Sequence, residues 1–66
     1  MLEEKAGTIA GEIWRALNGN AGMTQKQLKK AIKCVDKDLF LGLGWLLREG
    51  KILTSEVEGE LYVSLK

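Results

Sequence analysis

Few residues of this chain have the chemistry of a catalytic nucleophile or base. The 66 residues include no histidine, the side chain that most often serves as a general acid or base near neutral pH. The single cysteine, Cys34, lies beside Lys33 and near Lys37, and nearby cations lower the pKa of a thiol and activate it. Cys34 also precedes Val35 in a predicted turn between two core helices. We therefore interpret it as a packed apolar thiol and not as a nucleophile.

Metal ions, acid–base pairs and phosphate-binding loops are not predicted either. One cysteine without histidine does not supply the ligands of a tetrahedral zinc site. Glu56, Glu58 and Glu60 lie on a predicted hairpin and do not form a poised acid–base pair. Residues 42–44 are Gly-Leu-Gly, but they lie inside a predicted helix and lack the strand that precedes a phosphate-binding loop. We expect no catalytic residue, cofactor, metal ion or small-molecule substrate.

Residues that suit binding are more evident, and the first candidate is a concentration of lysines. Residues 24–37 contain five lysines and one aspartate, whereas the whole chain has a net charge of only +1. At about 100° per residue, four of these lysines fall on one outward arc of a predicted helix, opposite Leu28 and Ile32. Two interpretations stay open: phosphate contacts with DNA, or a solvated face that keeps the helix soluble. The candidate phosphate contacts are Lys26, Lys29, Lys30, Lys33 and Lys37.

The second candidate is an outward arc of the helix predicted from Asp36 to about Glu49. DNA base edges are read by polar side chains, but the middle of this arc is apolar. The arc consists of Lys37, Asp38, Leu41, Gly44, Trp45 and Arg48. The core side is expected to hold Asp36, Leu39, Phe40, Leu43, Leu46 and Leu47.

Two glycines in this helix favour close contact with another backbone. Each costs about 1 kcal/mol relative to alanine inside a helix, and a close approach would explain that cost. Trp45 beside Gly44 is typical of an interface, although it could also fold against its own hairpin or first helix. The candidate interface, for a second copy of the chain or another protein, is Leu41, Gly44, Trp45 and Arg48.

The helices and strands that must position these residues are predicted from the spacing of apolar residues and from the residues that begin and end helices and turns. Apolar residues recur at helical spacing over residues 2–17, and glycine and asparagine in residues 18–22 end that helix. Thr24 and Gln27 match a capping box that starts the lysine-rich helix, and Asp36 is expected to be the N-cap of the next helix. Residues 51–57 and 60–65 are predicted strands joined by a tight turn at Glu58-Gly59, with a short third strand near Gly22-Met23.

The first helix carries a smaller feature beside its apolar stripe. Trp14 flanks Gly7 and Gly11, which are one turn apart. This spacing lets another element lie close to the helix, either within the chain or as a second association surface.

Length and composition predict one domain over residues 1–66. The chain has room for one core and for no separate catalytic domain. Residues 1–5 are acidic where a signal peptide would be basic, and the apolar stretch 39–47 is too short to span a bilayer. A single cysteine fits a reducing compartment. We expect a cytoplasmic protein that does not contact membranes.

Three helices followed by a β-hairpin predict an α+β winged helix-turn-helix fold. The sequence resembles a family of small bacterial and archaeal winged helix-turn-helix proteins of unknown function. The matching stretches are residues 10–14, 16–18, 44–49, 51–52 and 59–62. The Gly-Trp-Leu-Leu-Arg-Glu run that starts at Gly44 is the most specific part. The resemblance implies the fold but brings neither catalytic residues nor an established ligand.

Two functions remain open for such a domain. The apolar outward arc favours association with a second copy or a partner protein. The fold and the lysines favour a DNA-binding regulator that contacts phosphates with little sequence specificity. The acidic hairpin weighs against DNA, because carboxylates are repelled by phosphates.

Overall fold

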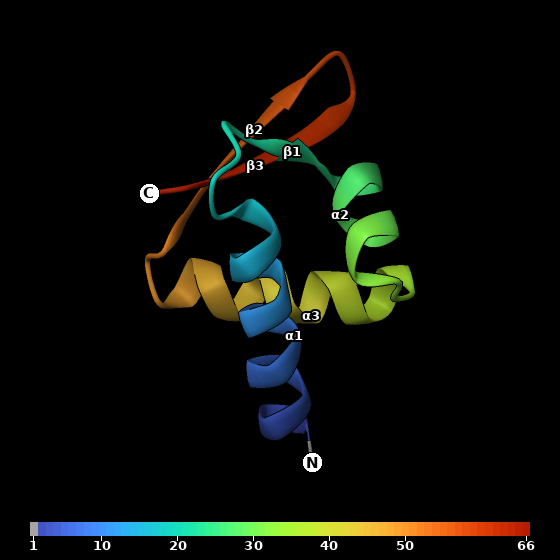
Figure 1. Ribbon diagram of the computed structural model, residues 1–66, viewed down its shortest axis with the longest axis vertical. Coiled ribbons are helices and arrows are strands. Elements are labelled where there is room, and N and C mark those ends of the chain that lie inside the picture. Colours follow the sequence, from blue (N-terminus) through green and yellow to red (C-terminus); the bar gives the residue numbers. More distant parts are fainter. Residues whose placement is uncertain (1) are drawn as a thin grey trace.

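The computed structural model describes residues 2–66 and consists of three helices and a three-stranded antiparallel sheet (Figure 1). The order of elements confirms the predicted α+β winged helix-turn-helix fold, including the short strand near Gly22-Met23. The elements are α1 (Leu2–Leu17), β1 (Met23–Thr24), α2 (Gln25–Ile32), α3 (Asp36–Arg48), β2 (Ile52–Val57) and β3 (Glu60–Leu65). None of the helices within residues 2–66 is long and apolar enough to cross a membrane.

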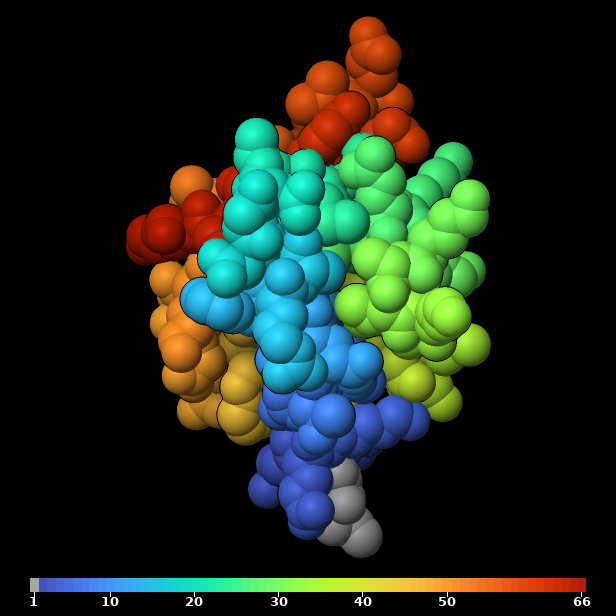
Figure 2. Space-filling model, viewed as in Figure 1, coloured from blue at the N-terminus to red at the C-terminus, as the bar shows by residue number. Residues whose placement is uncertain are grey.

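The sheet has the strand order β1-β3-β2, so the last strand lies in its centre. Val63 of β3 pairs with Met23 on one side and with Thr54 on the other. The predicted tight turn is confirmed, since Glu58 and Gly59 have φ values of 51° and 81°. Two successive positive φ angles are typical of a type I′ turn, whose twist matches that of a hairpin. The β2–β3 hairpin, here called the wing, projects from the body of the domain (Figure 2).

The core lies where α1 and α3 cross and where both meet the sheet. The buried stripe of α1 is Ala6, Ile9, Ala10, Ile13 and Leu17, at the spacing the sequence predicts. Gly42 makes the crossing possible, because a Cβ there would lie 2.6 Å from Ile9 Cγ2 and 2.8 Å from Ile13 Cδ1. Hydrogen is the only substituent that fits at this point, so the backbone of α3 rests directly on α1.

Capping interactions define the lysine-rich helix. The predicted capping box is confirmed: the Gln27 amide donates to Thr24 Oγ1 at 3.1 Å, and the Thr24 amide donates to Gln27 Oε1 at 2.9 Å. The N-cap prediction for the next helix is wrong by one residue, because Val35 is the N-cap and Asp36 is the first residue of α3. The Asp36 carboxylate instead accepts from Lys29 Nζ at 3.3 Å and so joins α2 to the start of α3.

Candidate functional site

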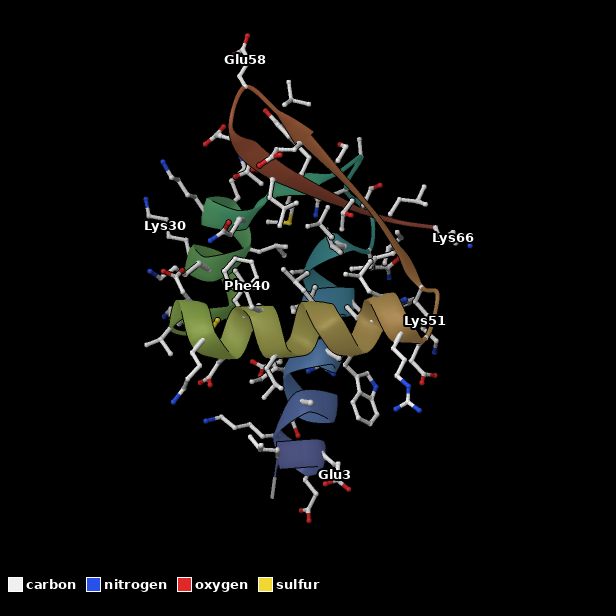
Figure 3. The ribbon with its side chains drawn as sticks, turned by 180° about the vertical axis from the view of Figure 1, so that it is seen from behind. Glu3, Lys30, Phe40, Lys51, Glu58 and Lys66 are labelled. Carbon is white, nitrogen blue, oxygen red and sulfur yellow. The ribbon has the colours of Figure 1, made fainter. Side chains whose placement is uncertain are left out.

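The exposed surface of α3 is apolar at its centre and charged at its ends. Phe40 and Leu47 are 47% and 50% exposed, and Gly44 lies between them. A Cβ at Gly44 would meet no atom within 4 Å, so nothing in the described chain requires glycine there. Figure 3 shows Phe40 on the side of α3 that faces the wing. We call this surface the α3 face; it consists of the exposed residues Asp36, Lys37, Phe40, Gly44, Leu47 and Arg48.

The orientation of α3 differs from the sequence prediction. Asp36, Phe40 and Leu47 were expected on the core side, but they are exposed. The buried side is instead centred on Leu39, Gly42, Leu43 and Leu46. The physical reason is Gly42, which admits Ile9 and Ile13 of α1 and thereby sets the rotation of the helix.

The four predicted interface residues therefore divide into two pairs. Gly44 and Arg48 are exposed on the α3 face, whereas Leu41 and Trp45 are half-buried. Trp45 packs against the edge of the core, on the side of α3 that faces α1. Phe40 and Leu47 were missed because a helix that is apolar nearly all round gives no polar residue from which to fix its rotation.

The five predicted phosphate contacts are all exposed, and they form what we call the lysine face: Lys26, Lys29, Lys30, Lys33 and Lys37. Two of them are already engaged by carboxylates, since Lys26 lies 3.9 Å from Glu60 and Lys29 lies 3.3 Å from Asp36. Across residues 2–66, the other three make no ion pair. The wing thus neutralises one end of the lysine face and leaves the remainder positive.

The thiol of Cys34 is half-buried between α2 and α3. Burial raises its pKa above the ordinary value, and the carboxylates of Asp38, Glu12 and Asp36 raise it further, while Lys29 acts in the opposite direction. The sequence-adjacent cations therefore do not activate this thiol. The raised pKa agrees with the interpretation of Cys34 as a packed side chain.

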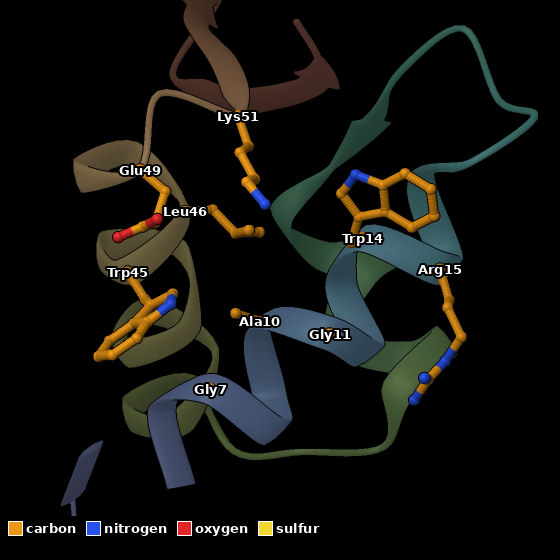
Figure 4. A pocket seen from close by; sticks show the side chains of 9 residues that line it. All are labelled: Gly7, Ala10, Gly11, Trp14, Arg15, Trp45, Leu46, Glu49 and Lys51. Atoms are coloured by element: carbon orange, nitrogen blue, oxygen red, sulfur yellow. The ribbon is translucent and has the colours of Figure 1, made fainter. Parts of the chain in front are cut away.

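A groove of about 440 Å³ lies between α1 and the C-terminal end of α3 (Figure 4). Its floor is the bare surface of α1 at Gly7 and Gly11, and its walls include the indoles of Trp14 and Trp45. We call it the tryptophan groove; it is lined by Gly7, Ala10, Gly11, Trp14, Arg15, Trp45, Leu46, Glu49 and Lys51. The sequence drew attention to Trp14 beside the two glycines and left open that Trp45 folds against the first helix, and the structure places both tryptophans at this groove.

Comparisons with known proteins agree with this architecture. The family model described as Winged helix-turn-helix domain (DUF2582) matches residues 1–65. The solution NMR structure of the protein BT2368 from Bacteroides thetaiotaomicron is similar to this chain at 28% sequence identity and a TM-score of 0.88. That alignment covers 98% of this chain and 79% of the other. A search of the curated proteins finds no match to this sequence.

Proposed function

The chain belongs to the family described as Winged helix-turn-helix domain (DUF2582), and we propose that it is a non-enzymatic binding module that pairs with a second copy of itself through the α3 face. The observation that carries this proposal is the exposed apolar centre of the helix that most helix-turn-helix proteins use to read DNA. Phe40 and Leu47 are each about half exposed. Gly44 lies between them, and the space where its side chain would stand is open. Such a surface is better suited to another apolar surface than to base edges.

The α3 face is complementary to itself when two copies cross in antiparallel orientation. If the crossing point lies midway between Phe40 and Gly44, the Phe40 ring of each copy lies over the bare backbone at Gly44 of the other. In the same arrangement Asp36 of one copy lies opposite Arg48 of the other. The stem of Lys37 then lies on Leu47, as long charged side chains commonly do on apolar surface. The antiparallel helix dipoles are also favourably placed.

The pairing is expected to be reversible and weak. Only a few large side chains stand exposed on the α3 face, so the buried area belongs to the small, transient class of protein interfaces. Sedimentation equilibrium over a range from about 10 µM to 1 mM is therefore the suitable measurement. We expect a monomer–dimer equilibrium within that range.

The sharpest test replaces Gly44, over which the Phe40 ring of the other copy lies in the proposed pair. Gly44→Leu fills that position without a clash inside the domain, so the variant is expected to fold and to remain monomeric. Gly11→Leu makes the same change on α1, away from the α3 face, and is expected to dimerise like the wild type. A wild type that stays monomeric at 1 mM, or a Gly44→Leu variant that still dimerises, would contradict the proposal.

The charged ends of the α3 face give a second, independent test. Asp36→Arg and Arg48→Asp each place like charges opposite one another, and each is expected to weaken dimerisation about threefold or more. The double variant restores opposite charges and is expected to recover most of the affinity. Recovery would also fix the antiparallel orientation, because a parallel pair would place residue 36 beside residue 36.

Non-specific DNA binding is a second candidate function. Its support is the lysine face, where three exposed lysines have no ion-pair partner within residues 2–66. Pairing through α3 would engage Lys37, which belongs to both surfaces, but would leave the remaining lysines of the two lysine faces accessible. Phosphate contacts alone would then provide affinity without sequence preference.

A further inference from the structure

We propose that the tryptophan groove binds a small molecule with a flat aromatic ring and one anionic group, such as a carboxylate or sulfonate. The groove is separate from both functions proposed above, because it opens between α1 and α3 and not on the α3 face or the lysine face (Figure 4). Its volume of about 440 Å³ lies within the range of about 300–1,000 Å³ typical of small-ligand pockets.

The aromatic part of the ligand is inferred from the walls and floor. Gly7 and Gly11 present bare helix backbone, and a Cβ at either position would meet no atom within 4 Å. Packing within residues 2–66 therefore does not explain two glycines that each cost about 1 kcal/mol inside a helix. A flat ring can approach such a floor closely, and the indoles of Trp14 and Trp45 offer faces and edges for stacking. Trp14 is 40% exposed and so available for contact.

The anionic group is inferred from the charges around the groove. Lys51 and Arg15 contribute two cations, and Glu49 contributes one carboxylate. Figure 4 shows the Lys51 side chain extending into the space between the helices, while Arg15 and Glu49 lie on opposite sides. In the described chain Lys51 makes no ion pair.

The backbone of Lys51 is held firmly, which fixes where its side chain enters the groove. Its amide donates to the carbonyl of Leu46 at 3.0 Å, and its carbonyl accepts from the amide of Lys66 at 3.1 Å. These two bonds tie the residue to the end of α3 and to the end of the sheet. The Lys51 side chain therefore starts from a fixed point of the backbone beside the groove, and its ammonium group would complement a carboxylate or sulfonate.

The experiment uses 8-anilinonaphthalene-1-sulfonate as the aromatic anion and N-phenyl-1-naphthylamine as its uncharged counterpart. Both tryptophans of the chain line the groove, so energy transfer from tryptophan to the bound dye reports occupancy directly. We expect saturable binding of one sulfonate dye per chain. Lys51→Gln is expected to weaken the sulfonate about threefold while leaving the uncharged dye unchanged.

Glycine variants provide the decisive comparison. Gly11→Leu and Gly7→Leu each place a side chain in the groove without an internal clash, and each is expected to lose dye binding at least about tenfold with unchanged or higher thermal stability. Gly44→Leu makes the same change outside the groove and is expected to bind the dye normally. Binding that survives both groove variants, or that exceeds one dye per chain, would overturn the site. Equal binding of both dyes, unaffected by Lys51→Gln, would overturn the anionic group.

Discussion

At the scale of single residues, Cys34 illustrates why neighbours in sequence are a poor guide to local charge. Lys33 and Lys37 flank it along the chain and suggest an activated thiolate. In the structure, burial is the largest influence on the thiol, and Asp38 is the next. Both raise the pKa, and the cation that opposes them is Lys29. The sequence could predict that Cys34 packs between helices, but not which charges face it.

The raised pKa of Cys34 makes a prediction about reactivity. Because the thiolate is the reactive form, iodoacetamide at pH 8 is expected to alkylate the folded protein more slowly than the protein unfolded in guanidinium chloride. Mass spectrometry of quenched samples measures both rates. Equal rates in the two states would contradict the burial of this thiol.

The same shift predicts how stability depends on pH. A raised pKa in the folded state means that folding favours the neutral thiol. That contribution is complete below the unfolded-state pKa of about 8.5 and is lost as pH rises through the folded-state pKa. Urea unfolding of the wild type and of Cys34→Ala, compared at pH 7 and pH 10, separates the contribution of the Cys34 thiol to stability from that of the lysines, which titrate in both proteins. We expect the wild type to lose more stability than the variant.

At the scale of elements, α3 separates what periodicity can predict from what it cannot. Its existence and its limits follow from the apolar run and the glycine after it, and the prediction is correct to within a residue or two. Its rotation does not follow, because residues 39–47 are apolar except for glycine and present no polar side. The contact of Gly42 with Ile9 and Ile13 decides the rotation, and that contact joins elements about thirty residues apart.

The two glycines of α3 are accordingly expected to respond in opposite directions to the same substitution. Gly42→Ala gains helix propensity but places a methyl group 2.6 Å from Ile9 Cγ2, so we expect a net loss of about 1–3 kcal/mol in the free energy of unfolding. Gly44→Ala meets no atom and should gain up to about 1 kcal/mol. Urea denaturation of both variants measures the difference. A stabilising Gly42→Ala would show that α3 and α1 do not approach as closely as described.

At the scale of the whole molecule, the order of elements predicted the fold, but the functional surfaces depend on how the elements are packed. The capping box and the hairpin turn are local signals, and each is confirmed. The tryptophan groove arises only when the C-terminal end of α3 lies against the middle of α1. The sequence left open that Trp45 folds against the first helix, but it did not single out Trp14 as the residue across the groove.

The distribution of charge over the whole molecule predicts how the affinity for DNA depends on salt concentration. The lysine face is opposed by the wing, where Glu60 already engages Lys26 and Glu56 and Glu58 are also exposed. Three lysines of the lysine face make no ion pair within residues 2–66 and remain to neutralise phosphates. Each phosphate contact contributes about −0.9 to the slope of log affinity against log salt concentration, so duplex DNA binding should show a slope of about −3.

Fluorescence anisotropy with two unrelated duplexes at 20, 50 and 100 mM salt measures this slope. We expect similar affinities for both duplexes, because nothing polar at the centre of the α3 face is available to read bases.

Replacing Lys30, Lys33 and Lys37 together by glutamine should abolish binding, whereas Lys51→Gln, a lysine outside the lysine face, should leave it nearly unchanged. A Glu58→Gln variant that binds more tightly would show that the wing approaches the duplex. Absence of binding at 20 mM salt, or binding that the triple variant retains, would exclude the lysine face as a DNA contact and leave pairing through α3 as the better supported function.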